Sequence, residues 1–461
     1  MMEPEKASKI ISKALGRGHF ADIYLEETET TFIVYDNDRL EKLVCGSDKG
    51  AGLRAIYGDY HTAYAYTNSF APEELMSLAE SLARLTGSTQ KNITIDEIKK
   101  IPFPEVKRPP QEESLAFKID LVKKANQAAR GASPEVAQVQ VTYHDLHKKI
   151  TIVNSEGLYI KGERLYTLLA VQVVTKRGEV IQTGHEPLGG AIGLEIFEKT
   201  PPEEIALKAA QRAILMLSAP KAPGGTMPVV LSAEAGGTMI HEAVGHGLEA
   251  DLAEEGFSVY AGRIGEKVAS SLITVIDDPT LMYQRGYYQF DDEGIFPEKT
   301  VLIENGVLKD FLYDRLSAMK AGKDSNGHGR RESYRFRPIP RMSNTYIAPG
   351  PHSPEEIIRS VDKGLFVKKM GGGQVDTISG NFVFEVTEGY LIEKGLLGEP
   401  VRGATISGNG PQILQIIDMV GNDLGFTIGT CGKDGQGVPV SDGQPTLRIP
   451  EIVVGGAIDQ K

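Results

Sequence analysis

Two histidines and a glutamate stand close together in the segment TMIHEAVGHGLEAD (238–251). Glu242 directly follows His241, and His246 lies five residues after the first histidine. On a regular α-helix, side chains five residues apart point about 140° away from each other, so two such imidazoles would not reach one ion. The spacing therefore excludes a shared metal ion unless the helix is locally irregular.

A single turn of π-helix removes this obstacle, because it holds more residues per turn and returns both histidines to one face. Gly245 and Gly247 supply the backbone freedom that such a distortion needs. The run VVLS at 229–232 is typical of a strand that leads into the motif. We therefore expect a helix from about Gly237 to Leu248 that contains a π-bulge.

The residue types match the chemistry of zinc peptidases. There, a glutamate in the position of Glu242 takes a proton from metal-activated water and passes it to the leaving amine. A catalytic zinc needs three protein ligands and one open position. The residues alone leave the third ligand open among Glu249, Asp251, Glu266 and Cys431. Cys431 by itself equally fits a buried, inert thiol.

The elements that must position these residues follow from hydrophobic periodicity. Four segments predict amphipathic helices: residues 7–15, 72–85, 115–130 and 203–217. Alternating or β-branched runs predict strands at 21–25, 32–35, 136–143, 150–153 and 168–175. Further along, TVLIENGVLKDFL (300–312) predicts a hairpin with an Asn-Gly turn, and 382–386 with 389–392 predict a further strand pair.

Two proline-rich segments divide the chain. We expect an N-terminal α+β subdomain (1–87), a linker (88–113), a second α+β subdomain (114–217), a short linker (218–228) and a β-rich metallopeptidase domain (229–461). The predicted fold class is α+β, with antiparallel sheets and helices followed by a barrel-like C-terminal domain.

Bulk composition limits the classes of partner and the cellular compartment that we expect for the protein. The chain of 461 residues carries a net charge of -12, which argues against binding to a nucleic-acid backbone. Two cysteines exclude a disulfide framework and favour a reducing compartment. The N-terminus MMEPEKASK lacks the apolar core of a signal peptide, and the longest apolar run (165–174) is too short to span a bilayer. We expect a cytoplasmic protein without membrane or nucleic-acid partners.

The chain resembles the TldD/PmbA family of metallopeptidases, and specifically its TldD branch, over nearly its whole length. The anchors of this resemblance are IHEAVGHGLEAD (240–251), FDDEG (290–294), VLIENG (301–306), GRRESY (329–334), PRMSNTY (340–346), GGGQVD (371–376), GNGP (408–411), MVGND (419–423) and TCGKDGQ (430–436). A weaker match is KGAGLRAIYGD (49–59). The PmbA branch lacks the histidine motif, so the motif indicates the catalytic branch.

The resemblance implies one zinc ion per chain, with His241, His246 and Cys431 as ligands and Glu242 as the general base. It also implies hydrolysis of peptide bonds in unfolded polypeptides and propeptides, and a dimer formed with a PmbA-like chain or with a second copy. The alternative is a non-proteolytic protein-binding regulator of the gyrase-modulator type that carries a zinc site.

Other family blocks suggest residues for substrate binding. His328 lies in a glycine-rich loop and is a candidate for polarising a carbonyl group. Arg330 and Arg331 are candidates for binding a substrate carboxylate or an oxyanion, although structural pairing with acidic residues is equally expected. Gly372 and Gly373 are predicted to form a turn beside the cleft.

Overall fold

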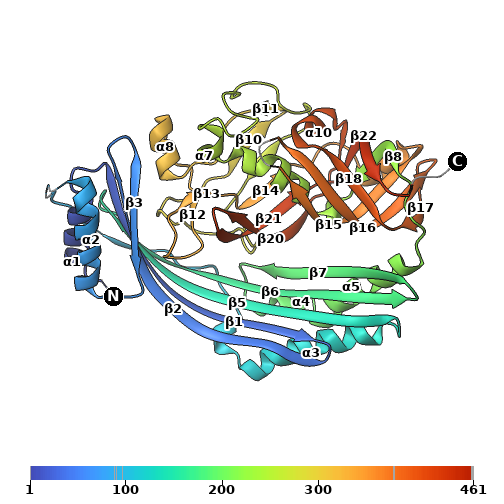
Figure 1. Cartoon of the computed structure of the whole chain (residues 1–461), viewed down its shortest axis with the longest axis horizontal. Coiled ribbons are helices and arrows are strands. Elements are labelled where there is room, and N and C mark those ends of the chain that lie inside the picture. Colours follow the sequence, from blue (N-terminus) through green and yellow to red (C-terminus); the bar gives the residue numbers. More distant parts are fainter. Residues whose placement is uncertain (1, 88, 90, 96, 377–378, 458–461) are drawn as a thin grey trace.

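The computed structural model describes residues 2–87, 89, 91–95, 97–376 and 379–457. They form two parts: an N-terminal part of long strands and helices, and a C-terminal part of shorter strands around a barrel (Figure 1). The predicted α+β class with a barrel-like C-terminal domain is confirmed. Among the described residues, no helix combines the length and the apolar character needed to cross a membrane.

One sheet organises the N-terminal part. Its order in the described chain is β3-β2-β1-β5-β6-β4, and β7 also pairs with β6. The strands are β1 (Phe20–Asp36), β2 (Arg39–Tyr57), β3 (His61–Thr67), β4 (Ile98–Lys100), β5 (Val136–Asn154), β6 (Tyr159–Arg177) and β7 (Val180–Gly190). Strands from both predicted N-terminal subdomains thus share one sheet, and the subdomain boundaries stay a prediction.

The strands β1 and β5 are longer than their hydrophobic runs. β1 includes the two runs predicted at 21–25 and 32–35, together with the polar EETET between them. β1 pairs with β2 and with β5 along almost its whole length. Pairing on both sides satisfies the backbone of the polar segment, so the strand continues where hydrophobic alternation stops.

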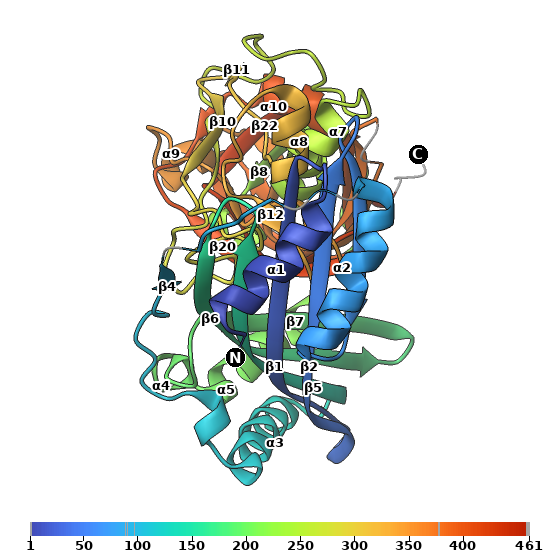
Figure 2. The same cartoon turned by 90° about the vertical axis from the view of Figure 1, so that its left-hand side faces the viewer.

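Helices cover this sheet at two places, and the four predicted helices are confirmed. They are α1 (Pro4–Leu15), α2 (Pro72–Thr86), α3 (Leu115–Gly131) and α5 (Pro202–Ser218), with the short α4 (Ile196–Lys199) and η1 (Pro110–Glu112) between them. α3 and α5 share a hydrophobic core with β5 and β6, whereas α1 and α2 pack on the other end of the sheet (Figure 2). α2 begins with a proline and two acidic residues and ends at Gly87, as its capping residues predict.

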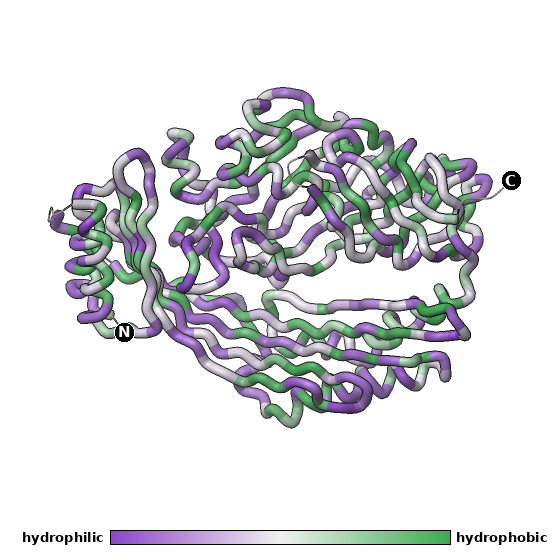
Figure 3. The backbone as a smooth tube through the Cα atoms, viewed as in Figure 1, coloured by the Kyte–Doolittle hydropathy of each residue, from purple (hydrophilic) through white to green (hydrophobic). Residues whose placement is uncertain are grey.

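The C-terminal part contains a closed barrel of five strands. These are β8 (Gly225–Leu231), β15 (Lys363–Val375), β16 (Asn381–Glu393), β18 (Ala404–Asn409) and β22 (Leu447–Gly455), with β17 (Leu396–Val401) and β19 (Met419–Val420) attached. The barrel closes because β16 pairs with both β18 and β15. Figure 3 shows hydrophobic segments within this part and along the long strands of the first sheet.

A second sheet lies beside the barrel and has the order β11-β10-β9-β14-β21-β20. Its strands are β9 (Val275–Asp277), β10 (Thr300–Glu304), β11 (Val307–Leu308), β14 (Asn344–Ile347), β20 (Gly425–Lys433) and β21 (Gln436–Gln444). The smaller elements are η2 (Ala233–Ala235), α7 (Ala250–Ala253), α8 (Arg315–Ala321), β12 (Gly329–Arg330), β13 (Ile339–Pro340), α9 (Pro354–Arg359) and α10 (Gly410–Ile416). The hairpin predicted at 300–312 is confirmed as β10 and β11.

The strand pair predicted at 382–386 and 389–392 is wrong, because both runs belong to the single strand β16. The two residues between the runs, Thr387 and Glu388, carry no turn chemistry. β15 pairs with both halves of β16, with irregular register between them. The interruption of the hydrophobic pattern is therefore an irregularity inside one strand and not a turn.

Candidate metal centre and catalytic cleft

The histidine motif folds into a helix that changes type twice. α6 (Thr238–Ile240) leads into the π-helical turn η3 (His241–Gly245), and the 3-10 turn η4 (His246–Leu248) follows. The predicted helix and its π-bulge are both confirmed. The irregularity covers the residues between the two histidines, which is where the five-residue spacing requires it.

Packing holds this irregular turn in place. Ile240 and Val244 are buried in the main hydrophobic cluster of the C-terminal part. Gly245 faces Met342, and a Cβ atom built at Gly245 would lie 2.0 Å from the Met342 sulfur. Position 245 therefore has no room for a side chain while Met342 keeps its place.

The turn brings three potential metal ligands together. The rings of His241 and His246 have centroids 5.1 Å apart. One ligand atom from each of His241, His246 and Cys431 lies within 4.8 Å of the others. Cys431 comes from β20, and all three side chains are buried. The chain thus assembles two imidazoles and a thiol from distant segments, since His246 and Cys431 are 185 positions apart in the sequence.

Carboxylates orient both imidazoles. His241 Nδ1 lies 2.6 Å from Asp442 Oδ1 of β21, and His246 Nδ1 lies 2.9 Å from Glu249 Oε2. Because a carboxylate accepts the proton of Nδ1, each ring presents Nε2 toward the cluster. Lys433 Nζ in turn lies 3.1 Å from Glu249 Oε2. Carboxylate partners of this kind are the usual second layer around a metal-binding histidine.

Electrostatic interactions within the cluster shift the pKa values of its three side chains more strongly than burial does. Burial raises the pKa of the Cys431 thiol, but hydrogen bonds and charge interactions with the two histidines lower it to about 6. Burial lowers the pKa of His241, but Asp442 and Cys431 raise it well above its usual range. Burial likewise opposes the effects of Glu249 and Cys431, which raise the pKa of His246 to about 10. The negative charges of the Cys431 thiolate, Asp442 and Glu249 therefore favour positive charge between the two imidazole rings and the sulfur.

The donor set fits a metal ion of the zinc type. A thiolate and two imidazoles suit zinc and disfavour magnesium or calcium, which prefer oxygen ligands. Zn–S and Zn–N bonds of about 2.3 and 2.0 Å at a tetrahedral angle place sulfur and nitrogen about 3.5 Å apart. Cys431 Sγ and His246 Nε2 are 3.5 Å apart.

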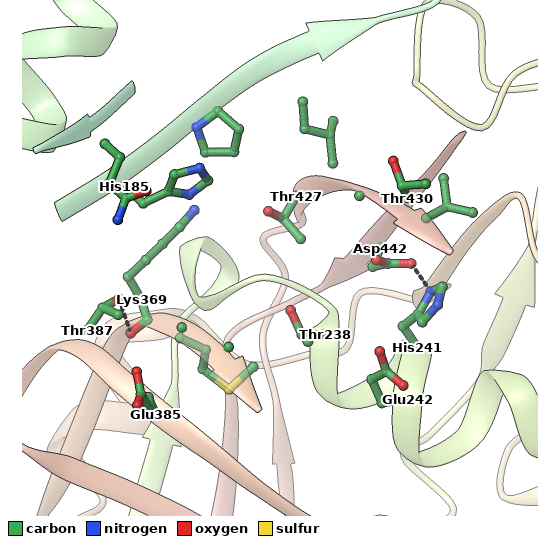
Figure 4. Close-up of a pocket in the computed structure, with 18 of the residues that line it drawn as sticks. His185, Thr238, His241, Glu242, Lys369, Glu385, Thr387, Thr427, Thr430 and Asp442 are labelled. Atoms are coloured by element: carbon green, nitrogen blue, oxygen red, sulfur yellow. Dashed lines mark hydrogen bonds and ion pairs between the residues drawn. The ribbon is translucent and has the colours of Figure 1, made fainter. Parts of the chain in front are cut away.

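A cavity of about 420 Å³ opens beside the cluster and is lined by both parts of the molecule. His241, Glu242 and Asp442 lie at one end of it in Figure 4, and His185 and Lys369 lie at the other. His185 belongs to β7 of the first sheet, so the N-terminal part forms one wall of the cleft. Three potential ligands beside an open cavity are the arrangement expected of a catalytic metal site rather than of a closed structural one.

Three family models match nearly the whole chain. They describe the PmbA/TldA metallopeptidase domain 1 (residues 21–86), central domain (108–217) and C-terminal domain (224–456). A metalloprotease TldD homolog of Haemophilus influenzae is 36% identical over 448 residues, covering 95% of this chain and 93% of the relative. The chain belongs to the PmbA/TldD metallopeptidase family.

Other relatives agree with this assignment. A zinc metalloprotease TldD homolog of Saccharolobus solfataricus is 30% identical over 98% of this chain and 100% of its own length. A crystal structure described as a putative modulator of a DNA gyrase from Thermotoga maritima has a TM-score of 0.78 at 24% identity, covering 95% of this chain and 96% of its own. The structure of TldE from Thermococcus kodakarensis has a TM-score of 0.74 at 22% identity, over 98% and 99% of the two chains. This PmbA/TldD protein is a metalloprotease, a hydrolase of peptide bonds.

The other acidic residues considered as ligands of this PmbA/TldD metallopeptidase have different partners. Glu249 bonds to His246, and the Asp251 carboxylate accepts a hydrogen bond of 2.6 Å from Lys433. Glu266 is exposed and pairs with Arg263 at 2.9 Å. None of the three belongs to the described cluster of ligand atoms.

The predicted substrate-binding residues lie in two places. Gly372 lines the cavity, but the turn predicted at Gly372 and Gly373 is wrong, because both residues lie within strand β15, which pairs with β16. His328, Arg330 and Arg331 are fully or almost fully buried and are not among the described lining residues. Their role in substrate binding stays a prediction.

The contacts of these three buried residues are internal. His328 Nε2 lies 3.0 Å from Asp277 Oδ1, and Arg330 donates to the backbone oxygens of Met342 and Pro439. Arg331 donates to the backbone oxygen of Asp292 at 3.0 Å.

Sequence reasoning did not find Asp442, Lys369 or His185. Asp442 orients His241 from 201 residues further along the chain, and no local pattern connects the two. His185 and Lys369 line the same cavity only because β7 and β15 both face it (Figure 4). The last family block, TCGKDGQ (430–436), ends before Asp442, so no motif quoted from the sequence pointed to this residue.

Proposed function

We propose that this protein is a zinc-dependent peptidase that cleaves unfolded or extended polypeptides and propeptides. One zinc ion per chain would be held by His241, His246 and Cys431, with Glu242 as the general base. The observation that carries this proposal is the buried cluster of those three ligands, whose histidine rings are fixed by Asp442 and Glu249, at the end of an open cavity.

Each protein group then has a definite task. Zinc, when bound, supplies a Lewis acid that polarises a peptide carbonyl and acidifies a water molecule. Glu242 would accept a proton from the attacking water and pass it to the amine of the departing peptide. Asp442 and Glu249 keep the imidazoles in the tautomer that presents Nε2. The thiolate of Cys431 donates more charge than a neutral ligand and makes the site sensitive to oxidation.

The walls of the cleft favour an extended chain. Its lining includes residues of β7 and of β20. In the described pairings, β7 bonds only to β6 and β20 only to β21, so each strand has a free edge. A peptide in extended conformation can pair with such an edge through its backbone, without recognition of a particular sequence. Most of the backbone of a folded protein is already paired, so an unfolded chain offers many more segments that can bind in this way.

The same proposal includes a partner and a compartment. Similarity to the fold of TldE supports a dimer with a PmbA-like chain or with a second copy. The cytoplasmic location stays a prediction from the low cysteine content.

The proposal is tested with one substrate in two conformations. A small disulfide-bonded protein is offered in its native form and in its reduced, alkylated form, with and without a chelator and with zinc restored. We expect the unfolded form to be cut at least about tenfold faster, because a folded chain must first open locally. Chelation should abolish cleavage and zinc should restore it.

Equal cleavage of the two forms would contradict the substrate class. Zinc bound at one ion per chain without cleavage of either form, also after addition of a PmbA-like partner, would favour the regulator of the gyrase-modulator type.

A further inference from the structure

Lys369 differs from the other basic residues around the cleft. It lies on β15 at the end of the cavity opposite to Glu242, and its side chain extends toward His185 of β7 (Figure 4). Lys369 is half-buried. Among the described residues, no hydrogen bond or ion pair of its ammonium group is found, whereas Lys368, its neighbour in sequence, pairs with Glu388 at 3.0 Å. Within the part of the chain that the structure describes, this cation of the cavity therefore has no direct ion-pair partner.

The nearby carboxylates are already used by other cations. Arg212 lies between two of them, 2.9 Å from Glu186 and 3.0 Å from Glu388. The remaining acidic group that attracts Lys369 is Glu234, which is exposed and forms no ion pair with it.

Burial lowers the pKa of Lys369, and the attraction of Glu186 opposes this shift. Holding a charged ammonium here without a partner costs free energy that a bound anion would recover.

Besides Lys369 and His185, the described lining of this end of the cavity includes the ionisable residue Glu385. Figure 4 shows it on the far side of the Lys369 backbone, with the ammonium directed away from it and toward the imidazole of His185. An anion at the tip of Lys369 would therefore meet a cationic donor and an imidazole.

We propose that Lys369, with His185 beside it, forms a subsite for a carboxylate of the peptide substrate, remote from the bond that is cut. This inference rests on the proposed peptidase function of the cleft, because a carboxylate is the anionic group that peptides carry. The carboxylate belongs either to the C-terminus of the substrate or to an aspartate or glutamate side chain. Both have the charge and the two oxygens that an ammonium and an imidazole can bind.

The subsite gives the enzyme a preference that backbone pairing alone cannot give. A substrate that places its carboxylate on Lys369 is fixed in register relative to Glu242, so one bond along the chain is presented to the metal centre. An otherwise identical peptide without the carboxylate leaves Lys369 unpaired in the cleft and binds more weakly.

The test uses peptides that differ only in one charge. One pair has a free or an amidated C-terminus, and a second pair has glutamate or glutamine at an internal position. Binding is measured by fluorescence anisotropy to the zinc-loaded Glu242→Gln variant, and cleavage is measured separately with Glu242 intact. In both the binding and the cleavage measurement, the protein with Lys369 unchanged is compared with Lys369→Met, Lys369→Arg and the matched control Lys368→Met.

We expect the acid form of at least one pair to bind about tenfold more tightly than its amide, as one charge-assisted hydrogen bond provides. Lys369→Met should bring the ratio of acid to amide affinity close to one, Lys369→Arg should keep most of it, and Lys368→Met should leave it unchanged. The pair that shows the preference identifies the terminal or the side-chain carboxylate as the ligand.

Two results would overturn the subsite: equal affinity for acid and amide in both pairs, or a ratio that Lys369→Met leaves intact. Failure of the catalytic proposal is recognised separately. If the protein with Glu242 intact cuts none of the peptides while the Lys369-dependent binding ratio persists, the carboxylate subsite stands and the proposed hydrolysis falls.

Discussion

Each histidine of the candidate metal cluster has one carboxylate within hydrogen-bond distance of its Nδ1 atom. Asp442 and Glu249 fix the imidazole rings of His241 and His246, and neither belongs to the described group of three ligands. In the proposed zinc centre these carboxylates would act through the orientation and basicity of the rings, whereas Cys431 would bind the metal itself.

We predict that Asp442→Asn lowers zinc affinity by about 10- to 100-fold, because an amide orients His241 Nδ1 less firmly and does not stabilise positive charge on the ring. Competition with a chromophoric chelator measures the affinity. Asp434→Asn is the control, since Asp434 is exposed and close in sequence but has no described bond to a histidine. Equal loss of affinity in both variants would show that only net charge matters.

At the scale of elements, the π-helical turn η3 is the feature that makes the five-residue spacing usable. Within this turn, the side chain of Met342 occupies the space that a side chain at position 245 would need. The turn is thus fixed by tertiary packing as well as by the sequence of the motif.

Gly245→Ala is predicted to destabilise the fold by about 1–3 kcal/mol, because the new methyl group overlaps Met342 in a well-packed core. In a Met342→Ala background the same change should be close to neutral, since the methyl group then enters vacated space. Urea unfolding of the four proteins in the presence of a chelator measures both costs. An equal cost of Gly245→Ala in the two backgrounds would assign the glycine a purely backbone role.

The elements also show how far sequence reasoning extends. The helices at 72–86 and 202–218 follow from periodicity and capping, which are local properties. The π-turn follows from geometry, because two histidines five residues apart need it to share a site. The continuity of β1 through EETET, and of β16 through Thr387 and Glu388, could not be predicted in the same way. Both depend on pairing with strands elsewhere in the chain.

At the scale of the whole molecule, buried charges connect the N-terminal sheet to the C-terminal part. Arg54 of β2 forms ion pairs with Asp22 of β1 and with Glu293 of the FDDEG block, the latter at 2.6 Å. Arg164 of β6 pairs with Asp292 at 2.9 Å. Two family blocks outside the histidine motif, KGAGLRAIYGD (49–59) and FDDEG (290–294), therefore contribute residues to this junction. Such long-range pairing left no pattern in the sequence.

We predict that Arg54→Met lowers the free energy of unfolding by about 3–5 kcal/mol, because Asp22 and Glu293 remain buried without their partner. Thermal unfolding followed by circular dichroism measures the change. Arg39→Met at an exposed position of β2 is the matched control and should change stability by less than about 0.5 kcal/mol. Similar Tm values for the two variants would mean that the junction contributes little.

The same junction predicts a dependence of stability on pH. Burial, and then Glu293, raise the pKa of Asp314 from 3.8 to about 7. Between these two pH values the folded state holds a proton on Asp314 that the unfolded state has lost. The stabilisation that this proton gives to the folded state is therefore complete below pH 3.8 and disappears as pH rises through about 7. We expect the Tm of the unmodified protein to fall as pH rises through this interval, and the Tm of Asp314→Asn to fall less. Parallel curves for Asp314→Asn, the exposed control Asp324→Asn and the unmodified protein would exclude Asp314 as the cause.

The most direct test of the whole account combines zinc content with cleavage of one unfolded peptide, for protein purified without a metal-binding tag. The unmodified chain, Glu242→Gln, Cys431→Ala and the control Glu266→Gln are compared. We predict about one zinc per chain in the unmodified protein and in Glu242→Gln, but a loss of cleavage of at least about hundredfold in the latter. Cys431→Ala should lose zinc and activity together, and Glu266→Gln should change neither. Full zinc content in Cys431→Ala, or undiminished cleavage by Glu242→Gln, would contradict the proposed centre.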